Sequence, residues 1–135
     1  MRSIKYILIN ESLPENSPGV PRIRRDRDRG YHYVVNAAGV VRNPLDIHQS
    51  GTFAAVIRNL NPFDRRDYNA FSIGIQYNGS LEEDPKQREA LVELLIDLRS
   101  HFPEAKILTT SEIDGKSILP SDAMNRLRLE LSDLP

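Results

Sequence analysis

Short apolar segments alternate with polar, proline-rich segments along this chain of 135 residues. Residues 4–9 read IKYILI, which is apolar and β-branched enough to form a buried strand. Residues 31–35 (YHYVV) predict a second strand, and the sequence NAAG at 36–39 provides a turn after it. Val40 and Val41 then return as the partner strand. The first part of the chain therefore predicts one strand followed by a hairpin.

The second half predicts a strand, a helix and a further strand. Residues 72–77 (SIGIQY) form the first of these strands, in which Gly74 indicates close backbone approach or a bulge. Leucines recur at helical spacing between Pro85 and His101, and a proline suits the first position of a helix. Residues 105–109 (AKILT) complete this set as a strand.

The intervening segments contain prolines and glycines, which interrupt helices and strands, so we expect loops there. These predicted loops are residues 11–30, 43–70 and 110–120. A last helix begins at Ser121 or Asp122, and its inward-facing side chains are Met124, Leu127 and Leu131. Strands that alternate with helices predict an α/β fold, in which a mixed sheet is flanked by helices in a single domain over residues 1–135.

The composition excludes several kinds of site. The chain has no cysteine, which excludes disulfides, iron–sulfur clusters, a thiol nucleophile and every zinc site that needs a thiolate. The net charge of −1 gives no overall field that favours nucleic acid or a membrane surface. No apolar run approaches the roughly 20 residues of a membrane span, and the first strand is not followed by a cleavage site. We therefore expect a cytoplasmic protein, or one released at cell lysis.

One charged segment is open to two interpretations. Residues 22–29 contain five arginines and two aspartates. Alternating charges of this kind can neutralise one another on a solvated loop. Alternatively, the arginines form a patch for the phosphate or carboxylate groups of a partner, since a guanidinium pairs with these anions through two parallel hydrogen bonds. No aromatic series is interleaved with them, which disfavours single-stranded nucleic acid.

Residue spacing alone identifies no active site. His32 lies within a predicted strand, where a buried, hydrogen-bonded role is expected. His48 lies in a loop with no partner at metal-ligand spacing, and His101 ends the long helix, where it complements the helix dipole. No Ser-His-Asp order, HExxH, P-loop or GxGxxG motif is present.

Four segments, in order, resemble the zinc-dependent N-acetylmuramoyl-L-alanine amidase family. They are KYILINES (5–12), GYHYVVNAAGVV (30–41), NAFSIGIQYNG (69–79) and residues 84–122, which follow the family's helix, strand and final loop. Together they cover most of the chain. The resemblance implies the α/β fold of phage lysozyme-type amidases and peptidoglycan recognition proteins, and a function connected with the peptidoglycan of bacterial cell walls.

The positions that this resemblance assigns to zinc ligands carry other residues. The family's first strand ends in a zinc-binding histidine, where this chain has Asn10. The family's final loop reads His-S-E-I-x-G-K-x-Cys-P-S, and here Thr110 replaces the histidine while Ile118 or Leu119 replaces the cysteine. These side chains cannot supply the nitrogen and thiolate ligands that hold zinc. We therefore expect no zinc or other cofactor, and hypothesise a pseudoenzyme that keeps the fold and groove but has lost the hydrolase chemistry.

Two family residues are retained. Tyr31 matches the active-site tyrosine of the GYH motif, and Lys116 matches a lysine implied to stabilise the oxyanion. Neither generates a nucleophile, so these two catalytic positions are insufficient for hydrolysis. We expect the groove to bind a peptidoglycan fragment or another peptide without cutting it. The candidate binding residues are Asn10, Tyr31, Asn69, Thr110 and Lys116.

Two alternatives remain open. The first is an active peptidoglycan amidase with a displaced metal site. The side chains that such a site would use are His32 or His48, with Asp46 or Glu112. The second is a protein-interaction or regulatory module, in which the loops 11–30 and 43–70 form the surface for a protein partner.

Overall fold

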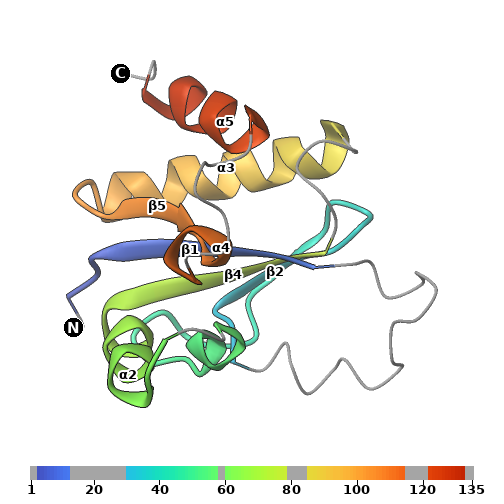
Figure 1. Cartoon of the computed structure of the whole chain (residues 1–135). Helices are drawn as coiled ribbons and strands as arrows, with labels where there is room; N and C mark the ends of the chain where they lie inside the picture. The colour runs from blue at the N-terminus through green and yellow to red at the C-terminus, as the bar shows by residue number, and fades with distance from the viewer. Residues whose placement is uncertain (1–2, 13–29, 58–59, 79–84, 115–121, 133–135) are drawn as a thin grey trace.

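A computed structural model describes residues 3–12, 30–57, 60–78, 85–114 and 122–132. Within these residues, one mixed sheet has the strand order β3-β2-β4-β1-β5 (Figure 1). Its strands are β1 (Tyr6–Ser12), β2 (Tyr33–Val35), β3 (Val41–Arg42), β4 (Ser72–Asn78) and β5 (Lys106–Thr109). The pairs β1–β4, β1–β5 and β2–β4 are parallel, and β3 pairs antiparallel with β2 as the predicted hairpin.

Helices cover both faces of this sheet. They are η1 (Phe53–Val56), α2 (Pro62–Phe71), α3 (Pro85–His101), α4 (Thr110–Asp114) and α5 (Asp122–Ser132). In Figure 1, α3 and α5 lie above the sheet, whereas η1 and α2 lie below it. None of the helices in the described part of the chain is long and apolar enough to cross a membrane.

The α3 side of the sheet holds the larger core. The isoleucines of β1 and β4 stand opposite one another in parallel register, Ile7 beside Ile73 and Ile9 beside Ile75, and all four are fully buried. They belong to one cluster with the leucine stripe of α3 and with Leu127 and Leu131 of α5. The predicted leucine face of the long helix is therefore confirmed, because its i, i+3, i+4 spacing places these side chains on the sheet.

The opposite side packs closely because of one glycine. Gly74 lies in β4 beside Leu8 of β1, and the Phe53 ring covers it. A Cβ atom at this position would lie 2.5 Å from Cδ1 of Phe53. The register between β1 and β4 is continuous from Tyr6 to Ser12. The close approach at the Gly74 backbone is made by the Phe53 side chain, and the alternative of a bulge is wrong.

Two predicted loops contain helices instead. Residues 43–70 include η1 and most of α2. Asn61 caps α2, since its side chain accepts a hydrogen bond from the Asp64 N–H at 2.9 Å. Pro62 then occupies the first helical turn, where its missing N–H costs nothing. Residues 110–114 form α4, which tertiary contacts described below hold in place. The mixed α/β architecture is confirmed, while a single domain over the whole chain stays a prediction.

Candidate functional site

Asn10 is the centre of a side-chain network at the carboxyl end of the sheet. It lies beside Gln76 in the parallel β1–β4 register, so the two side chains project from the same face. Asn10 Nδ2 donates hydrogen bonds to Gln76 Oε1 and to the Tyr31 hydroxyl oxygen, both at 2.9 Å. Asn10 Oδ1 accepts a hydrogen bond from Thr110 Oγ1, also at 2.9 Å. One carboxamide thereby joins four segments that are distant in the sequence.

The network is buried at one end and reaches the surface at the other. Tyr31 is 1% exposed and Gln76 is 4% exposed, whereas Asn10 and Thr110 are partly exposed. The Tyr31 ring also lies beside Phe53, with 5.8 Å between the ring centroids. Hydrogen bonds are stronger electrostatically in such apolar surroundings, and an unsatisfied partner is costly there. The Asn10–Thr110 end is the part of the network that solvent reaches.

Thr110 is positioned by a charged contact behind it. The Glu112 carboxylate on α4 accepts hydrogen bonds from the Thr109 N–H at 2.9 Å and from Thr109 Oγ1 at 3.1 Å. It also pairs with the guanidinium of Arg128 on α5, which donates to the Ile107 carbonyl oxygen as well. These contacts fix the start of α4, and therefore Thr110, next to the end of β1.

The electrostatics of Glu112 follow from the same contacts. Burial by itself raises the pKa of this carboxyl group, because the charged form loses hydration. The hydrogen bonds from Thr109 and the Arg128 guanidinium act in the opposite direction and outweigh burial, so the pKa lies below its ordinary value. Glu112 is therefore a carboxylate at neutral pH, and its negative charge is paired with Arg128 and hydrogen-bonded to Thr109.

These side chains do not fit the zinc ion that the amidase resemblance implies. Protein zinc sites use histidine nitrogen, cysteine sulfur or carboxylate oxygen, and Asn10 and Thr110 offer a carboxamide and a neutral hydroxyl. The Asn10 amide nitrogen and oxygen are both occupied by hydrogen bonds within the protein. In the described ranges, no cluster of three histidine, cysteine or acidic residues is suitable for a metal ion.

Of the residues considered for a displaced metal site, His32, Asp46 and Glu112 make side-chain hydrogen bonds within the protein. His32 is fully buried: its Nδ1 accepts the Gly74 N–H at 3.0 Å and its Nε2 lies 2.7 Å from the Gln49 carbonyl oxygen. The ring is therefore neutral with its proton on Nε2, and the prediction of a hydrogen-bonded core histidine is confirmed. His48 is exposed, and Asp46 Oδ1 accepts its backbone N–H.

The remaining candidates divide into two groups. Asn69 lies on α2, where its Oδ1 accepts the Ala54 N–H at 2.9 Å and so joins α2 to η1. It is thus tied to the η1 backbone instead of the Asn10 network. Lys116, Leu119 and residues 22–29 lie outside the described residues, as does Ile118. Sequence reasoning predicted that Asn10, Tyr31 and Thr110 belong to one site, but it missed Gln76. A polar residue inside a buried strand could have indicated Gln76.

Comparison with known proteins identifies the fold. No protein-family model and no curated protein sequence matches this chain. The N-acetylmuramoyl-L-alanine amidase LysC from Clostridium intestinale matches it in structure with a TM-score of 0.65 and 16% identity, over 96% of this chain and 87% of that one. The Drosophila peptidoglycan recognition protein SD matches with a TM-score of 0.59 and 19% identity, over 100% of this chain and 83% of that one.

A third match extends the comparison to another insect protein. Bumblebee PGRP-SA matches with a TM-score of 0.51 and 14% identity, over 98% of this chain and 83% of that one. The TM-scores establish the architecture, whereas identities of 14–19% leave the chemistry to be argued from the residues. The fold implied by the four sequence segments is confirmed: this chain has the architecture shared by N-acetylmuramoyl-L-alanine amidases and peptidoglycan recognition proteins.

Proposed function

We propose that this protein binds a peptidoglycan fragment or a related peptide without hydrolysing it, as a zinc-free pseudo-amidase. The observation that carries this proposal is the Asn10 network at the end of the central strand. The resemblance assigns a zinc ligand to the Asn10 position, and here that side chain is bonded to Tyr31, Gln76 and Thr110. The shared fold supports peptidoglycan as the class of ligand.

The chemistry of the network favours binding over hydrolysis. Amide hydrolysis requires an activated water molecule and a polarised carbonyl group, which the family's zinc supplies. A carboxamide, a phenol and an aliphatic hydroxyl are neutral at pH 7, and none is a general base for water. They are, however, donors and acceptors that match the amide groups of a peptide. The partly exposed Asn10 and Thr110 are the residues that we expect to contact the ligand.

The proposal also includes residues outside the described part of the chain. Lys116 is expected to donate a hydrogen bond to a ligand carbonyl oxygen, as the resemblance implies. The arginines of residues 22–29 are expected to pair with the carboxylates of a peptide stem. We further propose that the protein acts in the cytoplasm or is released at lysis, where such fragments are accessible.

A binding and cleavage assay on the full chain tests the proposal. The probe is N-acetylmuramoyl-L-alanyl-D-isoglutamine, which contains the amide bond that the related amidases are named for. We expect saturable binding in calorimetry, unchanged by EDTA or added zinc, and an intact probe in mass spectrometry after long incubation. Thr110→Val should weaken binding about three- to tenfold, because it removes one hydroxyl while preserving shape.

The matched control is Thr52→Val, which makes the same chemical change at an exposed residue outside the network. It should bind the probe as the parent does. Cleavage that depends on zinc and is abolished by EDTA would show an active amidase and overturn the proposal. An absence of saturable binding would overturn it as well.

A further inference from the structure

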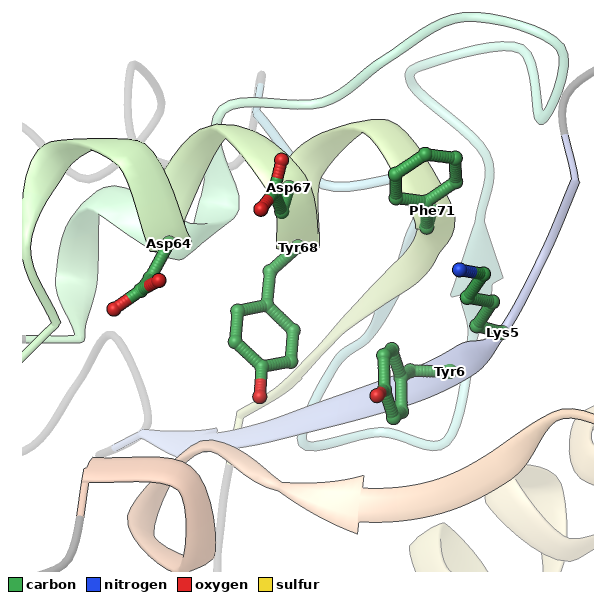
Figure 2. Close-up of a pocket in the computed structure, with 6 residues that line it drawn as sticks. All are labelled: Lys5, Tyr6, Asp64, Asp67, Tyr68 and Phe71. Carbon is green, nitrogen blue, oxygen red and sulfur yellow. The ribbon is translucent and has the colours of Figure 1, made fainter.

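A pocket lies between α2 and the amino end of β1 (Figure 2). Its volume is about 310 Å³, which is within the size range of sites for small ligands. The residues that line it are Lys5, Tyr6, Asp64, Asp67, Tyr68 and Phe71. Tyr6 and Asn10 are four residues apart on β1, or roughly 13 Å along an extended strand. The pocket is therefore separate from the Asn10 network.

The charged groups of the pocket are segregated. Asp64 and Asp67 are three residues apart on α2, which places them on neighbouring positions of one helix face. Lys5 lies at the other end, where its Nζ is 4.6 Å from the centroid of the Phe71 ring. Figure 2 shows Asp64 and Lys5 at opposite ends of the lining. Asp64 and Phe71 are separated by about 10 Å along the helix axis.

Two tyrosines form the middle of the pocket. The rings of Tyr6 and Tyr68 are 5.2 Å apart between centroids, with an interplanar angle of 46°. Burial raises the pKa of Tyr68, and Tyr6 and the negative charge of Asp64 raise it further. The Tyr68 hydroxyl therefore stays protonated at neutral pH and is available as a hydrogen-bond donor. Together the two rings provide an apolar surface, and their hydroxyl groups provide polar atoms at its edge.

Most polar groups of this pocket have no hydrogen-bond or ion-pair partner among the described residues. Across the described residues, no hydrogen bond or ion pair engages the carboxylates of Asp64 and Asp67, the Lys5 ammonium group, or the hydroxyls of Tyr6 and Tyr68. The Asn10 amide differs, because its polar atoms are bonded within the protein. The pocket thus combines two anionic groups, an aromatic centre and one cationic group, all able to bind a ligand.

We propose that this pocket binds a short peptide with a free amino group and a free carboxylate. The peptide ammonium pairs with Asp64 and Asp67, and the peptide carboxylate pairs with Lys5. The backbone between them lies against Tyr6 and Tyr68. Because an extended chain spans about 3.3–3.6 Å per residue, two or three residues match the distance between the two charged ends. This proposal does not depend on the function proposed for the carboxyl end of the sheet.

The test uses the full chain labelled with ¹⁵N and the tripeptide Ala-Leu-Ala as the probe. We expect saturable chemical-shift changes at residues 5–6 and 64–71. Two matched peptides remove one charge each: the N-acetylated form lacks the ammonium group and the C-amidated form lacks the carboxylate. Each should bind about tenfold more weakly, since charge-assisted hydrogen bonds are the stronger ones.

Variants assign these charges to residues. Asp64→Asn and Asp67→Asn should each weaken binding of the free tripeptide about three- to tenfold. Both should leave binding of the N-acetylated form unchanged. Glu93→Gln is the matched control, since Glu93 is an exposed carboxylate on α3, on the opposite side of the sheet. A variant spectrum that retains the parent's dispersion shows that the fold is intact.

Three results would overturn this proposal. The first is equal affinity for the free, acetylated and amidated peptides. The second is a set of shifts centred on Asn10 and Thr110 instead of the pocket, which would place the peptide in the network at the other end of the sheet. The third is an absence of saturable shifts at millimolar peptide. None of these results contradicts binding of the muramoyl probe, so the failure of this proposal is distinguishable from the failure of the proposed function.

Discussion

Replacing Asn10 with leucine tests whether the carboxamide network stabilises the fold. Leucine has nearly the same shape as asparagine, so the change removes polar atoms and leaves the volume almost unaltered. Three hydrogen bonds are lost, those to Tyr31, Gln76 and Thr110. The Tyr31 hydroxyl and the Gln76 Oε1 then face an alkyl group in buried surroundings.

The expected loss of unfolding free energy is about 2–4 kcal/mol, since each hydrogen bond contributes about 0.5–1.5 kcal/mol net. Burial of Tyr31 and Gln76 moves the value upward, because water does not easily replace the lost partner. Partial exposure of Thr110 moves it downward. An unfolding entropy of about 2.1 cal/mol/K per residue converts this loss into a decrease in Tm of about 7–14 °C for a chain of 135 residues.

Urea unfolding followed by far-ultraviolet circular dichroism measures this loss, with thermal unfolding as a second measurement. The matched control is Asn125→Leu, the same replacement at an exposed position of α5. It should change the unfolding free energy by no more than about 0.5 kcal/mol. If Asn10→Leu also stays within that limit, or stabilises the protein, the hydrogen-bonded carboxamide does not hold these segments together.

Three further predictions concern other parts of the structure. Gly74→Ala should lower the unfolding free energy by about 1–3 kcal/mol in the same urea assay, because the new Cβ would overlap the Phe53 ring; an unchanged midpoint would contradict the packing described here. Glu112→Gln should be less stable than the parent at pH 7 because it loses the charged contact with Arg128. Since the folded-state pKa of Glu112 lies below its ordinary value of 4.5, the carboxylate's contribution is present above that value and lost as pH falls through the lowered pKa. The two stability curves should therefore converge in acid, and parallel curves would contradict this reasoning. Neither added zinc nor EDTA should shift the Tm, whereas a rise with zinc would indicate a metal site that stabilises the folded state.

Local patterns predicted the parts of the fold in which periodicity and burial agree. The α3 leucines and the isoleucines of β1 and β4 are examples, because the spacing of the residues on one buried face identifies each element as a helix or a strand. The segment that forms α2 did not follow such a pattern, since it carries four charged residues and none of its side chains is fully buried. Its start was nevertheless encoded locally, in the cap at Asn61 and the proline that follows.

The site needed information beyond local patterns. Asn10 is 21 positions from Tyr31 and 100 from Thr110, so only the family resemblance placed them together. Gln76 was missed because its contact depends on the parallel register of β1 and β4, which no spacing within either strand reveals. The short α4 was missed for a related reason: Glu112 holds it through Arg128 of another helix.

A hydrogen bond connects Asn10 and Thr110, two of the positions to which the resemblance assigns zinc ligands. In the amidases, the resemblance places zinc between the end of the first strand and the final loop, so the metal joins segments distant in sequence. Here the Asn10 carboxamide joins the end of β1 to Tyr31, β4 and the start of α4. A single Asn10→His substitution would break these hydrogen bonds and still leave Thr110 as a hydroxyl, so it would cost stability without forming a zinc site. The residues around Asn10 are therefore connected to one another by hydrogen bonds, and the Asn10–Thr110 end of this network is partly exposed.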